Sequence, residues 1–125
     1  MTGAADRAPY GLDPSTWVAV TRDDREVVGY LQPTAPDFAA VIPRNRLGHA
    51  VGGPQEYVEA EELLIDRGIG ELAEHWRLDG GGQALAISEL SANGIVLRDA
   101  LLSKALVHGE AVIVDWPDLA GRLTR

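Results

Sequence analysis

Short apolar runs, separated by glycine and proline, characterise this sequence of 125 residues. A typical run is Ala111-Val112-Ile113-Val114, which has the length of a buried strand. No run approaches the roughly 20 apolar residues that a membrane helix needs. The 14 glycines and 7 prolines follow no regular period, which excludes a fibrous repeat. The chain must therefore pack several short elements around a core, and we expect no membrane partner.

The composition favours one globular domain that needs no disulfide or metal to fold. Hydrophobic residues make up 46% of the chain, which is ample for a core at this length. Cysteine is absent, so disulfides, thiolate metal sites and a cysteine nucleophile are excluded. We expect a single domain over 15–118, a flexible tail over 1–14 and a C-terminal tail that frays over 119–125. Residues 1–7 lack the features of a signal peptide, so we expect a cytoplasmic protein.

The first third of the chain predicts three short strands. Residues 16–21 and 26–32 are rich in β-branched and aromatic side chains and flank a polar turn, which is the pattern of a β-hairpin. Pro33 should end the second strand, since proline has no N–H to donate to a sheet. Residues 38–42 predict a third strand that ends at Pro43.

An amphipathic helix is predicted over residues 54–67. Pro54 suits the first helical position, and Gly68 suits the C-terminal stop. At about 100° per residue, one side of this helix is apolar: Tyr57, Ala60 and Leu64 fall together, flanked by Val58, Leu63 and Ile65. The opposite side carries Gln55, Glu59, Glu62 and Asp66. Glu61 lies at the edge of the apolar side and should be partly buried.

A three-stranded antiparallel meander is predicted over residues 71–98. The side chains of residues 72–78 follow the two-residue period of a strand. The Asp79-Gly80-Gly81-Gly82 turn then leads into a returning strand over 83–90. Asn93-Gly94 favours a type I′ hairpin turn before a third strand over 95–98.

The last quarter of the chain predicts a short helix and a final strand. Asp99 could cap a helix over 100–107, and the alternative is a strand that turns at His108-Gly109-Glu110. Residues 111–116 predict a buried strand that ends at Pro117. These elements together predict an α+β fold that is mainly antiparallel, with a small curved sheet or partly open barrel covered by the 54–67 helix.

The residues that could carry chemistry are scattered. His49, His75 and His108 form no local metal-ligand pair, and we expect neither a metal nor a cofactor. They could still converge in space with Glu74 or Asp115, and a small enzyme built from such separated residues is the alternative function. No serine lies in a nucleophile-elbow motif, so no catalytic residue is assigned.

Nucleic-acid binding is disfavoured by charge. The chain has 11 basic and 19 acidic residues, a formal net charge of −8, and it would repel a polyanion. The glycine-rich loop over 48–54 precedes a helix and lies near Arg44 and Arg46, which could suggest a phosphate site. Pro54 removes one N–H donor there and Glu56 would repel phosphate, so we expect a structural connection.

The acidic side of the predicted helix is the most distinctive surface feature. Residues 56–74 hold seven acids and one base, a local charge of 1 − 7 = −6. Such a run often serves only solubility, but it can also attract a basic partner. We predict a non-enzymatic binding or regulatory domain that docks a basic protein, with Glu59, Glu62, Asp66 and an exposed Trp76 at the interface. Sheet edges further suggest a homodimer.

Overall fold

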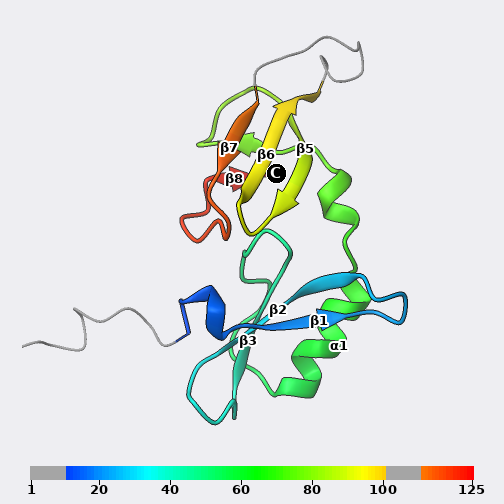
Figure 1. The fold of residues 1–125 in the computed structure, drawn as a ribbon, viewed down its shortest axis with the longest axis vertical. Coiled ribbons are helices and arrows are strands. Elements are labelled where there is room, and N and C mark those ends of the chain that lie inside the picture. The colour runs from blue at the N-terminus through cyan, green and yellow to red at the C-terminus, as the bar shows by residue number, and fades with distance from the viewer. Residues whose placement is uncertain (1–10, 101–110) are drawn as a thin grey trace, which may run out of the picture. The chain divides into compact units, whose positions relative to one another are not determined.

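The computed structural model describes residues 11–100 and 111–125, which form two compact units (Figure 1). One unit comprises Met1–Asn45 and Ala50–Gly68, and the other comprises Arg46–His49 and Ile69–Arg125. The described residues confirm an α+β fold in which all strand pairs are antiparallel. Three small sheets take the place of one curved sheet or partly open barrel. None of the helices in the described part is long and apolar enough to cross a membrane.

The first unit is built on a sheet with the order β1-β2-β3. The predicted hairpin is confirmed: β1 (Val18–Thr21) pairs with β2 (Val27–Pro33) across a polar turn. The third strand, β3 (Val41–Arg44), begins later than predicted and continues through Pro43. Pro43 fits there because β3 is an outer strand, where one missing N–H costs little, and its carbonyl accepts the Val51 N–H at 2.9 Å.

Residues 11–17, which precede β1, pack against this unit. A short 3-10 helix, η2 (Pro14–Thr16), is capped by the Asp13 side chain, which accepts the Ser15 N–H at 2.9 Å. The Trp17 indole donates to the Gly11 carbonyl and lies beneath the Arg44 guanidinium, 5.1 Å from the ring centre. Residues 11–14 of the predicted tail therefore belong to the folded unit, and residues 1–10 lie outside the described part.

The helix α1 (Tyr57–Arg67) packs on β2 and β3. It starts three residues later than predicted, and it ends at Gly68 as predicted, where a positive φ of 65° reverses the chain. Ala60 and Leu64 are its fully buried residues. Leu64 lies against Gly29 of β2, where an added Cβ would be 2.9 Å from a Leu64 methyl and 2.3 Å from the Arg44 carbonyl oxygen. Gly29 therefore lets the helix approach the sheet closely.

The second unit contains the β5-β6-β7 sheet and the small β4-β8 sheet. The hairpin of β5 (Leu85–Ser91) and β6 (Gly94–Asp99) is confirmed, and β7 (Val112–Val114) pairs with β6. In the other sheet, β4 (Arg77–Leu78) pairs with β8 (Leu123–Thr124). Both sheets contribute to one buried cluster: Leu47, Trp76, Leu85, Ile95, Leu97, Val114 and Leu123.

Several predictions for this unit are wrong in detail. The strand predicted over 72–78 is a 3-10 helix, η3 (Gly70–Ala73), followed by the short β4, which pairs with β8. The predicted pairing with the returning strand exists as one antiparallel bridge, in which Trp76 and Leu85 exchange backbone hydrogen bonds of 2.8 and 2.9 Å. The C-terminal residues do not fray, because Leu123 is buried in the core cluster. The predicted strand over 111–116 ends at Val114. The predicted helix over 100–107 falls largely on residues 101–110, which lie outside the described part.

Both predicted turns of this unit exist, with one shifted. Asp79 and Gly80 have φ values of 52° and 75°, as a type I′ turn requires, and the Gly81 N–H closes this turn on the Leu78 carbonyl. In the β5–β6 hairpin Ser91 pairs with Gly94, so Ala92 and Asn93 form the loop. Neither loop residue has a positive φ, and the type I′ turn predicted at Asn93-Gly94 is therefore wrong.

The close approach at Gly29 predicts a selective effect of adding a methyl group. Because the new Cβ would clash with the Arg44 carbonyl, we expect Gly29→Ala to lower the free energy of unfolding by about 1–3 kcal/mol. Gly53→Ala is the matched control, since nothing lies within 4 Å of a Cβ at Gly53. Urea denaturation followed by circular dichroism measures both variants. Equal midpoints for the two variants would contradict the packing described here.

Candidate functional site

The outer face of α1 carries the acidic residues that the sequence singled out. Glu59, Glu62 and Asp66 are all exposed, as predicted, while Ala60 and Leu64 on the other side are buried. Residues three and four apart on a helix are neighbours, so Glu62 adjoins both Glu59 and Asp66. Like charges at this spacing destabilise a helix slightly. The arrangement produces a continuous negative surface along about two turns of the helix.

Two exposed aliphatic residues lie on the same face. Val58 is 59% exposed and Ile65 is 44% exposed, so the prediction that both flank the buried side is wrong. At about 100° per residue, positions 58, 62 and 65 fall within a narrow sector of the helix, which places Val58 and Ile65 before and after Glu62 along the helix axis. We call this set the outer face, and it consists of Val58, Glu59, Glu62, Ile65 and Asp66. It combines negative charge with an apolar seam.

An open pocket of about 380 Å³ lies beside the end of the outer face. Ile65 of α1 lines it together with three residues of the β1–β2 turn, namely Arg22, Asp23 and Asp24. Asp24 binds the Arg22 guanidinium at 3.1 Å and accepts the Glu26 N–H at 2.9 Å. The hydrogen bond from the Glu26 backbone, assisted by Arg22, holds the pKa of Asp24 below its ordinary value. The pocket therefore offers one apolar wall and ionised carboxylate at its rim.

Trp76 does not contribute to an exposed surface. Its side chain is 3% exposed and belongs to the core cluster of the second unit. The indole N–H donates to the Glu71 carbonyl at 3.1 Å, and the Arg125 guanidinium lies 5.6 Å from the ring centre. The expected exposed tryptophan is thus a core residue, because its backbone pairs with Leu85 and its ring belongs to the buried cluster that includes Leu47 and Leu123.

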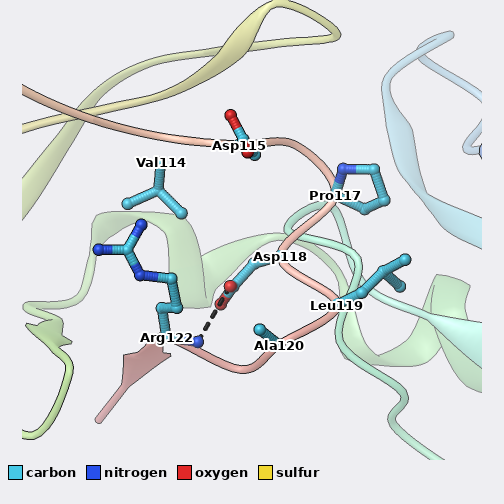
Figure 2. A pocket seen from close by; sticks show the side chains of 7 residues that line it. All are labelled: Val114, Asp115, Pro117, Asp118, Leu119, Ala120 and Arg122. Atoms are coloured by element: carbon cyan, nitrogen blue, oxygen red, sulfur yellow. Dashed lines mark hydrogen bonds between the residues drawn. The ribbon is translucent and has the colours of Figure 1, made fainter.

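The second unit contains a buried carboxylate that the sequence did not single out. Asp118 accepts the Arg122 N–H at 2.9 Å and the Leu123 N–H at 3.0 Å, and it lies 2.7 Å from His49 Nε2. Figure 2 shows its side chain directed at the backbone nitrogen of Arg122. Its own N–H donates to the Leu47 carbonyl at 2.9 Å. Asp118 therefore joins residues 46–49 to the C-terminal turn.

These hydrogen bonds keep Asp118 ionised. Burial alone would raise its pKa, but the hydrogen bonds from His49, Leu123 and Arg122 outweigh burial and lower the pKa below its ordinary value. A histidine oriented by a carboxylate is one part of a general acid–base arrangement. Here, however, the carboxylate also holds two backbone N–H groups, which is the work of a structural anchor. A pocket of about 230 Å³ lies beside it and is lined by Val114, Asp115, Pro117, Asp118, Leu119, Ala120 and Arg122 (Figure 2).

The other candidate chemical residues lie in unrelated surroundings. His75 and Asp115 are exposed, and Glu74 forms an ion pair with Arg125 at 3.2 Å. His108 lies outside the described residues. Within residues 11–100 and 111–125, no group of three potential ligands is placed to hold a metal ion. Of the predicted histidines and acids, His49 alone is joined to a carboxylate here, and its partner is the unpredicted Asp118.

The glycine-rich segment before α1 is a structural connection, as expected. The N–H groups of Val51 and Gln55 donate to the carbonyls of Pro43 and Val41, both at 2.9 Å. These N–H groups bind β3 and do not point to a ligand. Arg44 likewise donates to the Gln32 side chain at 2.7 Å while it covers Trp17. The segment and its neighbouring arginine thus hold the first unit together.

Comparisons with protein-family models, curated proteins and solved structures find no match to this chain. Its function is therefore inferred from the geometry described above.

The Asp118 anchor predicts a pH-dependent contribution to stability. The folded pKa is lowered, so the stabilisation is present above the ordinary carboxyl pKa and is lost as the pH falls through the folded value. Because Asp118→Asn would leave buried donors poorly matched, we expect a loss of about 1–3 kcal/mol at neutral pH. The difference between wild type and variant should shrink as the solution is acidified.

Urea denaturation at several pH values between neutral and acidic measures this difference. Asp115→Asn serves as the control, since Asp115 is exposed and lies three residues away along the chain. We expect that variant to stay within about 0.5 kcal/mol of wild type. A difference between Asp118→Asn and wild type that stays constant with pH would show that the Asp118 carboxylate is not the anchor.

Proposed function

We propose that this chain is a non-enzymatic cytoplasmic binding or regulatory domain that docks a basic protein partner on the outer face of α1. The observation that carries the proposal is the joint exposure of Glu59, Glu62 and Asp66 on one side of a helix whose other side is buried. A solubilising surface commonly mixes both signs of charge. Arg67, the basic residue of α1, stands at its last position.

Electrostatics supports a basic protein rather than a nucleic acid as the partner. The excess of acids over residues 56–74 accounts for −6 of the formal net charge of −8. Such a field attracts cationic surfaces and raises association rates, and it repels phosphate backbones. Complementary charge acts mainly on the rate of association and on partner choice.

The enzyme alternative has weaker support. Its strongest element is the His49–Asp118 pair at 2.7 Å, since a histidine held by a carboxylate is suited to proton transfer. Two of the hydrogen bonds to Asp118 come from the backbone and position the C-terminal turn. The pair is thus accounted for by the stability of the second unit, and the acidic outer face has no comparable structural role.

The docking proposal predicts the effect of removing two charges from the outer face. We expect Glu62→Gln with Asp66→Asn to abolish salt-sensitive capture of a partner from a lysate of the native host at about 50 mM salt. The matched control is Glu89→Gln with Asp115→Asn, which removes two exposed acids from the second unit. Mass spectrometry should find a basic protein retained by wild type and control but lost with the outer-face variant. If all three proteins retain the partner equally, the acids of the outer face serve only solubility and the proposal is wrong.

We also propose a homodimer formed through sheet edges. In the described part of the second unit, β7 is an outer strand beside β6, and its central Ile113 is 64% exposed. Outer strands with exposed apolar side chains are suited to pairing with a second copy. Light scattering at increasing protein concentration should show a dimer that Ile113→Lys dissociates. A wild-type chain that stays monomeric at high concentration would refute this proposal.

A further inference from the structure

We infer that the partner segment recognised by the outer face is a basic amphipathic helix that packs along α1. This inference rests on the proposed function and adds the chemistry of the ligand. Charge alone would suit any cationic surface, folded or extended. The exposed aliphatic residues Val58 and Ile65 favour a more specific ligand, because they add an apolar seam along one edge of the acidic surface.

The spacing of the seam favours a helix as ligand. Val58 and Ile65 are seven residues apart, which places them two turns or about 10.5 Å apart along α1. A partner helix that presents aliphatic residues at positions i and i+7 repeats this distance, and helices recognised by other helices commonly use such anchors. Only four large hydrophobic residues are substantially exposed in the described part of the chain, and two of them form this seam.

The pocket at the end of the seam suits an aliphatic anchor with basic neighbours. Ile65 forms its apolar wall, and Arg22 is already engaged by Asp24. The Ile65 wall suits an aliphatic group, which buries apolar surface there, while the carboxylates at the rim suit basic groups beside it. Lysine or arginine residues that flank this anchor would then face Asp23 at the pocket and Glu62 and Asp66 on the outer face.

The same charges disfavour a second copy of this chain as the occupant. Two outer faces brought together would oppose Glu59, Glu62 and Asp66 with identical carboxylates, and the like charges would repel each other. The homodimer proposed above uses a strand in the other unit and none of the residues of this face. The ligand of the outer face is thus a basic helix of another protein.

Two synthetic peptides of identical composition test the inference. The first has about 18 residues with leucine at helical i, i+3, i+4 and i+7 positions and lysine elsewhere, and the second is a scrambled order without an apolar side. Both carry a fluorescent label, and anisotropy measures their binding to the full chain at low salt. We expect the patterned peptide to bind about tenfold more tightly than the scrambled one.

Substitutions of the seam separate apolar from ionic contributions. Val58→Ser with Ile65→Ser should weaken the patterned peptide about tenfold and leave the scrambled peptide unchanged. Leu119→Ser is the control, because Leu119 is another exposed hydrophobic residue of the described part, at 45%, and lies outside both proposed interfaces. Circular dichroism should show that the seam variant and the control remain folded, since all three side chains lie at the surface.

Each outcome decides between the two proposals. Preference for the patterned peptide that disappears with the seam variant and survives in the control supports the inference. Equal binding of both peptides, weakened by Glu62→Gln with Asp66→Asn, overturns the inference and leaves the charge-based function standing. Binding that neither the seam nor the charge variant alters overturns both, and so does the absence of binding by either peptide.

Discussion

Leu64 of α1 lies against Gly29 of β2, and this contact fixes the rotation of the helix about its own axis. A side chain at position 29 would collide with the Arg44 backbone, so the helix sits close to the sheet only because a glycine is there. Once Leu64 and Ala60 are buried, the 3.6-residue repeat determines which residues face solvent. The outer face, with Val58, Ile65 and its three acids, is therefore a consequence of packing on the inner side.

The outer face combines two kinds of interaction that act on different steps of binding. Its carboxylates act over about a Debye length and favour encounter with a cationic partner. Its aliphatic side chains act only on contact and would lengthen the life of the complex by burying apolar area. The carboxylate of Asp118 behaves differently, because it is buried and satisfied within the chain. The role of each acid therefore depends on its burial and its hydrogen bonds, which the sequence alone does not give.

Local patterns in the sequence predicted much of the first unit and less of the second. The β1–β2 hairpin, the end of α1 at Gly68 and the exposure of Glu62 all follow from neighbouring residues. The burial of Trp76 depends on a core cluster that includes Leu47 and Leu123, which are far from it in the chain, and no local signal reports it. The contact between His49 and Asp118 has no local signal either, because the two residues are separated by 69 positions. The exposure of Val58 could have been predicted from the sequence, since this residue lies ~130° around the helix from the middle of the buried side.

The most direct test of this account is paramagnetic broadening of methyl signals by a soluble nitroxide, measured by NMR with and without the patterned basic peptide. In the free protein, the methyls of Val58 and Ile65 should broaden strongly, and those of Leu64 should stay sharp. Peptide at saturation should protect Val58 and Ile65 and leave exposed Leu119 as broad as before. Broadening of Leu64 in the free protein, or unchanged broadening of Val58 and Ile65 with peptide, would contradict the account.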